Sequence, residues 1–157
     1  MLALAFVLLL VYAAIELGPE AYDLLVTDCA TDLCCETCEF LPVTRIIDGD
    51  TFVSRGDRVR PFGYDAPEIG QPCADQATER FEQLAGSRVR IERGPRDRGR
   101  FGRMLAYVYT ESGTSIDETM VREGLAWAWR SDGQHLESLN AAEARAKDRE
   151  VGCLWER

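Results

Sequence analysis

Short apolar segments, separated by glycine, proline and acidic turns, most constrain the fold that this chain can adopt. Several of them have the alternation or composition of strands, and others have helical spacing. The expected strands are Val43–Ile47, Thr51–Ser54, Asp57–Tyr64, Arg88–Arg93, Met104–Tyr109 and the extended Leu125–Trp129. The expected helices are Asp75–Leu84, Asp117–Arg122 and Gln134–Arg149. This mixture predicts an α+β domain, a small barrel with helices on its outside.

At 157 residues, the chain is long enough for one domain of ordinary size and too short for two. Apolar residues make up 46% of it, which excludes wholesale disorder. The formal net charge is −9, which argues against a protein held on nucleic acid by overall positive charge. Residues 1–44 contain no Lys or Arg, however, and residues 88–103 contain seven arginines and two acids. That arginine-rich segment could attract a polyanion locally.

An unbroken apolar run, Met1–Ile15, opens the chain. It is short for a bilayer-spanning helix, which needs about 20 such residues, and it has the length of the apolar core of a signal peptide. A cleaved signal peptide, an uncleaved membrane anchor and a buried or amphipathic helix all remain open. Either of the first two would place the protein in the periplasm or outside the cell. The expected division is a hydrophobic helix in residues 1–17, an acidic, cysteine-rich linker in residues 18–40 and a folded domain in residues 41–157.

The six cysteines favour disulfide bonds, because an even number of them follows an export-like segment. Cys34 and Cys35 are expected to bond elsewhere rather than to each other, since neighbouring residues rarely satisfy disulfide geometry. A bond between Cys73 and Cys153 is attractive because both lie in the body of the domain. A zinc site is the competing interpretation, although the spacing lacks the paired CxxC motifs of a zinc ribbon.

Three clusters carry residues that are suited to chemistry on phosphate. They are Asp48-Gly49-Asp50-Thr51 at a strand turn, Arg60 with Asp65-Ala66-Pro67-Glu68 at a strand end, and the stretch from Arg96 to Arg103. Carboxylates at turns suit a hard cation such as Ca²⁺, and arginines offer phosphate a bidentate fork. Together they would supply a Lewis acid, a water activator and a charge clamp for phosphodiester cleavage. Each cluster alone has a plainer interpretation, as a common turn or a helix cap.

The joint pattern is more specific than its parts, and the region from about Val43 to Trp155 resembles the staphylococcal nuclease (thermonuclease) family. The matching strings are Ile47-Asp48-Gly49-Asp50-Thr51, Val59-Arg60, Asp65-Ala66-Pro67-Glu68, Phe101-Gly102-Arg103-Met104-Leu105-Ala106-Tyr107, Met120-Val121-Arg122-Glu123-Gly124-Leu125-Ala126 and Gly152-Cys153-Leu154-Trp155. The resemblance implies a five-stranded OB-fold β-barrel with three helices. It also implies a hydrolase, a Ca²⁺-dependent endonuclease that cleaves phosphodiester bonds of DNA and RNA.

The same resemblance assigns a metal site to particular residues. It implies that Asp50 and Asp65 ligate Ca²⁺ through their carboxylates and that Ala66 adds its backbone carbonyl. Asp48 would lie behind these ligands, and Thr51 beside them.

Catalysis is assigned by the resemblance to three further side chains. Glu68 would act as the general base on the attacking water, or orient that water. Arg60 and Arg103 would hold the scissile phosphate and stabilise the added negative charge of the pentacoordinate stage. The five side chains regarded as essential in the family are all present: Asp50, Asp65, Glu68, Arg60 and Arg103. The resemblance therefore disfavours a degenerate copy of the domain that binds its ligand without catalysis.

Two departures from the family concern groups near the substrate. Ala66 stands where the founding member has Thr, and Phe101 replaces a Tyr, so a hydroxyl is missing in each case. Aromatic side chains near the site are candidates for stacking on bases. The expected substrate contacts are Phe101, Trp127, Trp129, Arg98 and Arg100.

A second hypothesis stays open beside the nuclease. An OB-fold can serve as a non-catalytic module that binds nucleic acid or protein, with the acidic linker as a docking segment. The chain could then be an accessory subunit of a membrane assembly, held by its hydrophobic N-terminus. The sequence predicts no oligomeric state.

Overall fold

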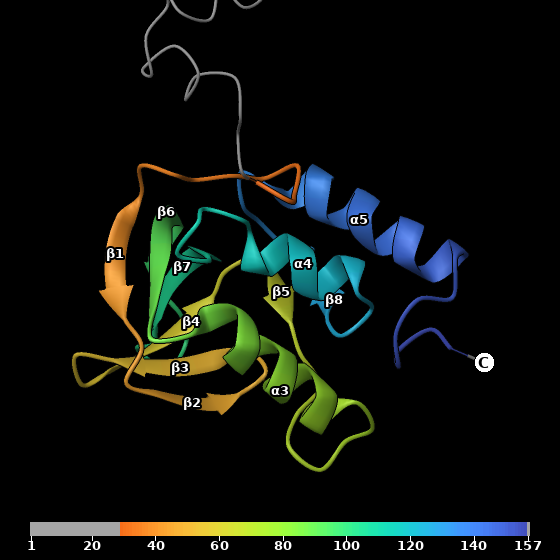
Figure 1. Ribbon diagram of the computed structural model, residues 1–157, viewed down its shortest axis with the longest axis horizontal. Helices are drawn as coiled ribbons and strands as arrows, with labels where there is room; N and C mark the ends of the chain where they lie inside the picture. The colour runs from red at the N-terminus through yellow and green to blue at the C-terminus, as the bar shows by residue number, and fades with distance from the viewer. Residues whose placement is uncertain (1–28, 157) are drawn as a thin grey trace, which may run out of the picture.

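A curled six-stranded sheet and three helices make up residues 29–156, the part of the chain that the computed structural model describes (Figure 1). The strands of this sheet are β1 (Glu39–Pro42), β2 (Arg45–Asp48), β3 (Thr51–Ser54), β4 (Asp57–Pro61), β6 (Arg88–Arg98) and β7 (Met104–Tyr109). They are ordered β1-β6-β7-β4-β3-β2, and all neighbours are antiparallel except β4 and β7. The short strands β5 (Tyr64–Asp65) and β8 (Trp127–Ala128) form a separate antiparallel pair.

The family resemblance implies five strands for the barrel, whereas the sheet has six, because residues 39–48 form two strands, β1 and β2. Val43 donates its N–H to the Ser87 carbonyl (2.9 Å) and Thr44 donates its N–H to the Val53 carbonyl (2.8 Å), so the chain changes partner here. Consequently β1 pairs with β6, whereas β2 pairs with β3. Residues 39–48 therefore supply both edge strands of the sheet, β1 and β2. Because one short stretch of chain connects the two edges, the sheet has to curl.

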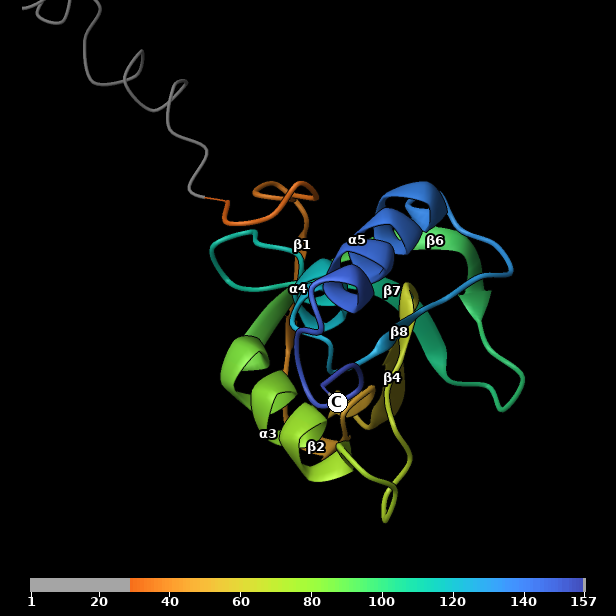
Figure 2. The same ribbon diagram turned by 90° about the vertical axis from the view of Figure 1, so that its right-hand side faces the viewer.

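Three helices pack beside the sheet, and their bounds agree with the expected ones to within two residues. They are α3 (Ala74–Ala85), α4 (Ile116–Arg122) and α5 (Leu136–Asp148). Figure 2 shows α3 and α5 on either side of α4, which contacts both. Fully buried aromatic side chains, among them Phe52, Phe81 and Tyr107, fill the core between helices and sheet. The prediction of an α+β fold with three helices is confirmed.

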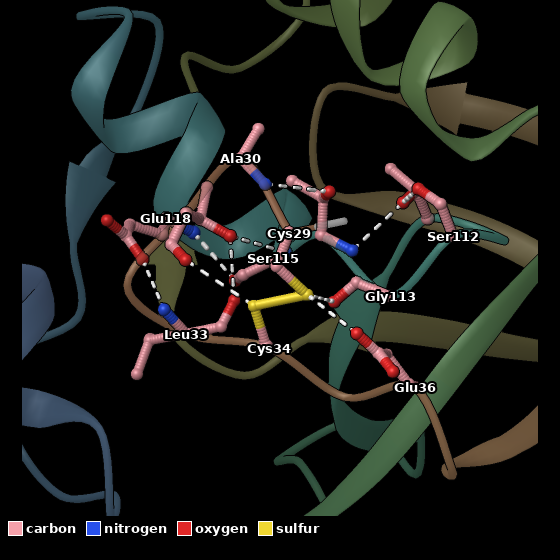
Figure 3. Close-up of a disulfide and its surroundings, with 12 residues drawn as sticks. Cys29, Ala30, Leu33, Cys34, Glu36, Ser112, Gly113, Ser115 and Glu118 are labelled. Carbon is pink, nitrogen blue, oxygen red and sulfur yellow. Dashed lines mark hydrogen bonds between the residues drawn. A yellow bond between two sulfur atoms is a disulfide. The ribbon is translucent and has the colours of Figure 1, made fainter. Parts of the chain in front are cut away.

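Residues 29–34, the first described part of the expected linker, lie against the start of α4 (Figure 3). Cys29 and Cys34 form a disulfide there. Leu33 donates its N–H to Glu118 Oε2 (2.8 Å), and its carbonyl accepts the N–H of Ser115 (3.2 Å). The segment thus satisfies polar groups at the N-terminus of the helix that would otherwise lack a partner.

All six cysteines are paired in disulfides. The bonds join Cys29 to Cys34, Cys35 to Cys38 and Cys73 to Cys153, with Cα atoms 6.0, 5.5 and 5.8 Å apart. The expectations that Cys34 and Cys35 do not bond each other, and that Cys73 bonds Cys153, are confirmed. The zinc interpretation is wrong, because no cysteine remains free to ligate a metal.

Loss of the Cys73–Cys153 bond is expected to lower the free energy of unfolding by about 4 kcal/mol, because the bond spans a sequence separation of 80 residues. The Cys35–Cys38 bond spans a separation of only 3, so the same loop-entropy argument gives about 2 kcal/mol. Urea unfolding of the two double cysteine-to-alanine variants measures both losses. Equal losses would contradict the dependence on loop length.

Residues 1–17, for which the sequence predicts a hydrophobic helix, lie outside the described residues. The signal-peptide and anchor interpretations, and membrane contact through this segment, therefore stay predictions. Within residues 29–156, no helix is both long enough and apolar enough to cross a bilayer.

Candidate active site

The turn from Asp48 to Asp50 directs one carboxylate inward between β2 and β3. The Asp48 side chain accepts the N–H of Asp50 (3.0 Å), an arrangement in which an aspartate completes a backbone turn. Gly49 is required between them, because a Cβ atom there would lie 2.9 Å from Ala66 Cβ and 3.0 Å from Ala77 Cβ. As a result, Asp50 is only 5% exposed.

Asp50 makes contacts through both of its carboxylate oxygens. Oδ1 accepts from Arg60 Nη1 (2.7 Å) and from the Thr51 hydroxyl (3.1 Å), and Oδ2 accepts the Ala66 N–H (3.0 Å). Burial raises the pKa of Asp50 to about 6, although the charge of Arg60 opposes the rise. A second cation beside this carboxylate would offset the same loss of hydration.

Arg60 joins the two carboxylates that are expected to share a metal. It lies on β4, in the interior of the sheet, and its second terminal nitrogen, Nη2, bonds Asp65 Oδ1. Asp65 ends β5, and half of its side-chain surface is exposed. One guanidinium therefore connects a buried carboxylate with one that is open to solvent.

A cleft of about 450 Å³ opens beside Asp65. Both arginines assigned to phosphate, Arg60 and Arg103, line it together with Asp65 and Glu68. The backbone N–H of Glu68 is held by Gln71 Oε1 (3.0 Å), and the Glu68 side chain is exposed. The structure thus brings all three predicted catalytic side chains, and the predicted metal ligand Asp65, to one surface.

Arg103 has hydrogen-bonding capacity left for a ligand. Its Nη1 donates to the Thr51 hydroxyl (3.3 Å), whereas its Nε is buried and has no partner among residues 29–156. Phe101, 78% exposed, lies beside the same group, with its ring centroid 5.9 Å from Arg103 Cζ. A guanidinium that lines a cleft favours an anionic ligand such as phosphate.

The arginine-rich segment is the end of a β-hairpin. The sequence predicts a strand that ends at Arg93, but β6 continues to Arg98, which pairs with Met104 of β7 after an irregularity in the ladder. Arg96 and Arg100 line the cleft. Arg98 does not line it and donates to the Gly102 carbonyl (2.7 Å) within its own hairpin.

Only one of the two candidate tryptophans lines the cleft. Trp129 does so, and its indole Nε1 donates to Asp132 (2.9 Å), which also binds the Arg96 guanidinium (2.6 Å). Trp127 pairs with Asp65 in the β5–β8 ladder, is half-buried and does not line the cleft. Trp129 is therefore the better candidate for a platform on which a base could stack.

Sequence reasoning missed two buried polar side chains that support the site from behind. Asp117 accepts the N–H groups of Gly63 (2.7 Å) and Val108 (2.8 Å), and Tyr64 donates its hydroxyl to the Gly49 carbonyl (2.8 Å). Helical periodicity, which places position 117 on the apolar face of α4, is the signal that could have identified the first. Tyr64 offers no such signal, because an aromatic residue in a strand is typical of any core.

Asp117 is expected to make the protein less stable as the pH rises from about 4 to about 7. Burial raises its pKa from the ordinary 3.8 to about 7, although its backbone hydrogen bonds oppose the rise. Between these values the folded state binds the proton more tightly than the unfolded state, so the free energy of unfolding falls by up to about 1.4 kcal/mol per pH unit. Denaturant unfolding across this range measures the slope. Asp117→Asn should remove this contribution to the slope. Asp57→Asn, at an exposed position, is the control and should keep it. If the free energy of unfolding depended on pH in the same way in Asp117→Asn and in the unaltered protein, the assignment to Asp117 would be wrong.

The fold and the cleft together define a class, a small α+β domain with carboxylates and arginines lining one cleft. The family model described as staphylococcal nuclease homologue matches residues 58–157. The chain belongs to this family, which confirms the resemblance found in the sequence.

Several relatives match over most of the chain. Endonuclease YncB of Bacillus subtilis (strain 168) is 32% identical over 127 residues, covering 71% of this chain and 59% of that protein. Micrococcal nuclease of Shigella flexneri is 35% identical, with coverage of 72% and 71%. Thermonuclease of Staphylococcus hyicus is 31% identical, with coverage of 67% and 69%. For some relatives the chain spans only about half of their length, between 45% and 59%.

Proposed function

We propose that the protein is a Ca²⁺-dependent nuclease that hydrolyses phosphodiester bonds of DNA, RNA or both outside the cytoplasm. The observation that carries the proposal is the single cleft lined by Arg60, Arg103, Asp65 and Glu68. The names of the relatives, which are nucleases and endonucleases, support the same activity.

The oxygen atoms around Arg60 fit a calcium ion. Asp50 and Asp65 would hold it through their carboxylates, and Ala66 would add its carbonyl, all of them hard donors of the kind that Ca²⁺ prefers. Among residues 29–156, no three acidic, histidine or cysteine side chains cluster as a complete cage, so water and substrate oxygens would complete the coordination. When bound, the ion would supply Lewis acidity and positive charge at the phosphate.

The side chains of the cleft would carry out the hydrolysis. Arg60 and Arg103, which both line the cleft, would hold the phosphate oxygens. Glu68 would orient a water molecule toward phosphorus and accept its proton. As the water oxygen bonds to phosphorus, the bond from phosphorus to the leaving oxygen breaks, and that oxygen keeps the bonding electron pair and takes up a proton from solvent. The two guanidinium groups stabilise the negative charge that is added at this stage.

The proposed location, periplasmic or extracellular, is supported by the paired cysteines. Disulfides persist in oxidising compartments and are rare in the cytosol. Mass spectrometry of the protein recovered from its host would determine its N-terminus and its cysteine redox state together. A recovered protein with six free thiols would argue against export.

A nuclease assay with and without Ca²⁺ tests the activity itself, with DNA and RNA offered in parallel. Release of acid-soluble nucleotides is expected with Ca²⁺ and should stop when a chelator is added. If no nucleotides are released at any Ca²⁺ concentration, the non-catalytic OB-fold module becomes the better hypothesis.

A further inference from the structure

Strand pairing does not join the two segments that would share the ion. Asp50 lies between β2 and β3 of the six-stranded sheet, whereas Asp65 ends β5, which pairs with β8 in the separate sheet. The backbone ladders of the two sheets therefore do not pair these two segments directly, although β5 follows β4 of the larger sheet after only two residues. Contacts outside the ladders then bring the two carboxylates together.

Tyr64 makes a direct contact between the two segments. Its side chain is fully buried, and its hydroxyl donates to the Gly49 carbonyl (2.8 Å). Tyr64 immediately precedes Asp65, and Gly49 immediately precedes Asp50, so one hydrogen bond joins the neighbours of both candidate ligands. Gly49 also lies so close to Ala66 that it has no room for a side chain, and the bond therefore lies within a rigid contact.

The other polar contacts between these segments use the ligand groups themselves. Arg60 bonds carboxylate oxygens of both Asp50 and Asp65, and the Ala66 N–H bonds Asp50 Oδ2. A cation or a phosphate that enters the site competes for these same groups. The Tyr64 hydroxyl bonds the Gly49 carbonyl, which is no candidate ligand atom, so this bond does not compete with a cation or a phosphate.

We propose that Tyr64 is a positioning residue that fixes the spacing of Asp50 and Asp65 for a divalent cation by bonding to Gly49. The inference rests on the calcium site proposed above. Tyr64 acts through the backbone of the Asp48–Asp50 turn and does not itself hold the ion. Its loss should therefore weaken cation binding even when no substrate is present.

Calorimetric titration of Ca²⁺ into the full, oxidised chain without substrate tests this role. Tyr64→Phe is expected to weaken Ca²⁺ binding about tenfold, the lower end of the range found when a group that orients a metal ligand is removed. Tyr109→Phe is the matched control, because it also removes the hydroxyl of a buried tyrosine, one that bonds Glu92 instead. The control should lower the melting temperature to a similar degree and leave Ca²⁺ affinity unchanged.

A second readout is the rise in melting temperature at a fixed Ca²⁺ concentration, which should be smaller for Tyr64→Phe than for Tyr109→Phe. Unchanged affinity in Tyr64→Phe, or the same loss in both variants, would overturn the role of Tyr64 and leave the calcium site standing. If the unaltered protein bound no Ca²⁺, the proposed metal dependence and the role of Tyr64 would both be refuted.

Discussion

Glu68→Gln is expected to slow phosphodiester hydrolysis by about 10²- to 10⁴-fold, the usual contribution of a positioned general base. Glutamine keeps the size of the side chain and can still bind water, but it cannot accept a proton. Because the Glu68 side chain is exposed, the free energy of unfolding should change by less than about 0.5 kcal/mol. Single-turnover hydrolysis of an oligonucleotide at saturating Ca²⁺, together with thermal unfolding, measures both quantities.

Glu79→Gln is the matched control for this experiment. Glu79 is exposed on α3 and does not line the cleft, so its replacement makes the same change in charge away from the reacting groups. It should retain full activity. A near-normal rate in Glu68→Gln would remove Glu68 from the mechanism, and an equal loss in both variants would point to net charge instead.

Arg103→Ala is expected to lower the rate by about 10²- to 10³-fold, as is typical when one donor to a developing negative charge is removed. Arg103 lines the cleft, and within residues 29–156 its Nε has no hydrogen-bond partner. The hydrogen bond from Arg103 to the Thr51 hydroxyl is long at 3.3 Å, so the free energy of unfolding should change little. The measurements are the single-turnover rate and the melting temperature of the variant.

Arg103→Lys separates the effect of charge from that of geometry. Lysine keeps the positive charge but loses the planar fork that binds two phosphate oxygens, so we expect only partial recovery of the rate. Arg45→Ala, on the exposed part of β2, controls for the loss of one positive charge. Full activity in Arg103→Ala would exclude this residue from stabilising the transition state.

Elements that depend on local rules could be predicted from the sequence. Met104–Tyr109 forms β7 with the expected bounds, because its apolar run stands between clear turns. The strand β1 could not be predicted, because its cause lies far away along the chain. The Phe40 ring lies against the guanidinium groups of Arg88 and Arg90, whose Cζ atoms are 4.6 and 4.1 Å from its centroid. No local pattern in Glu39–Pro42 indicates this contact.

The candidate site shows the same limit. The ordered motifs predicted that separate carboxylates and arginines belong to one site, and the cleft brings Arg60, Arg103 and Glu68 together. Arg98 and Trp127, which the sequence also predicts at the substrate, do not line the cleft. Their positions depend on the register of β6 against β7 and on the pairing of β8, and no local rule determines either.

Arg60 provides the free site with an internal counter-ion. Its guanidinium binds Asp50 and Asp65 at the same time, so both carboxylates have a positive partner before any ligand arrives. A cation that bound these oxygens would release the guanidinium for phosphate. The cation would then replace Arg60 as the positive partner of the carboxylates, and phosphate would replace the carboxylates as the negative partner of Arg60. If binding of one ligand favours binding of the other in this way, thermodynamic linkage makes the effect reciprocal and equal in size. Each ligand would then bind more tightly in the presence of the other than it does alone.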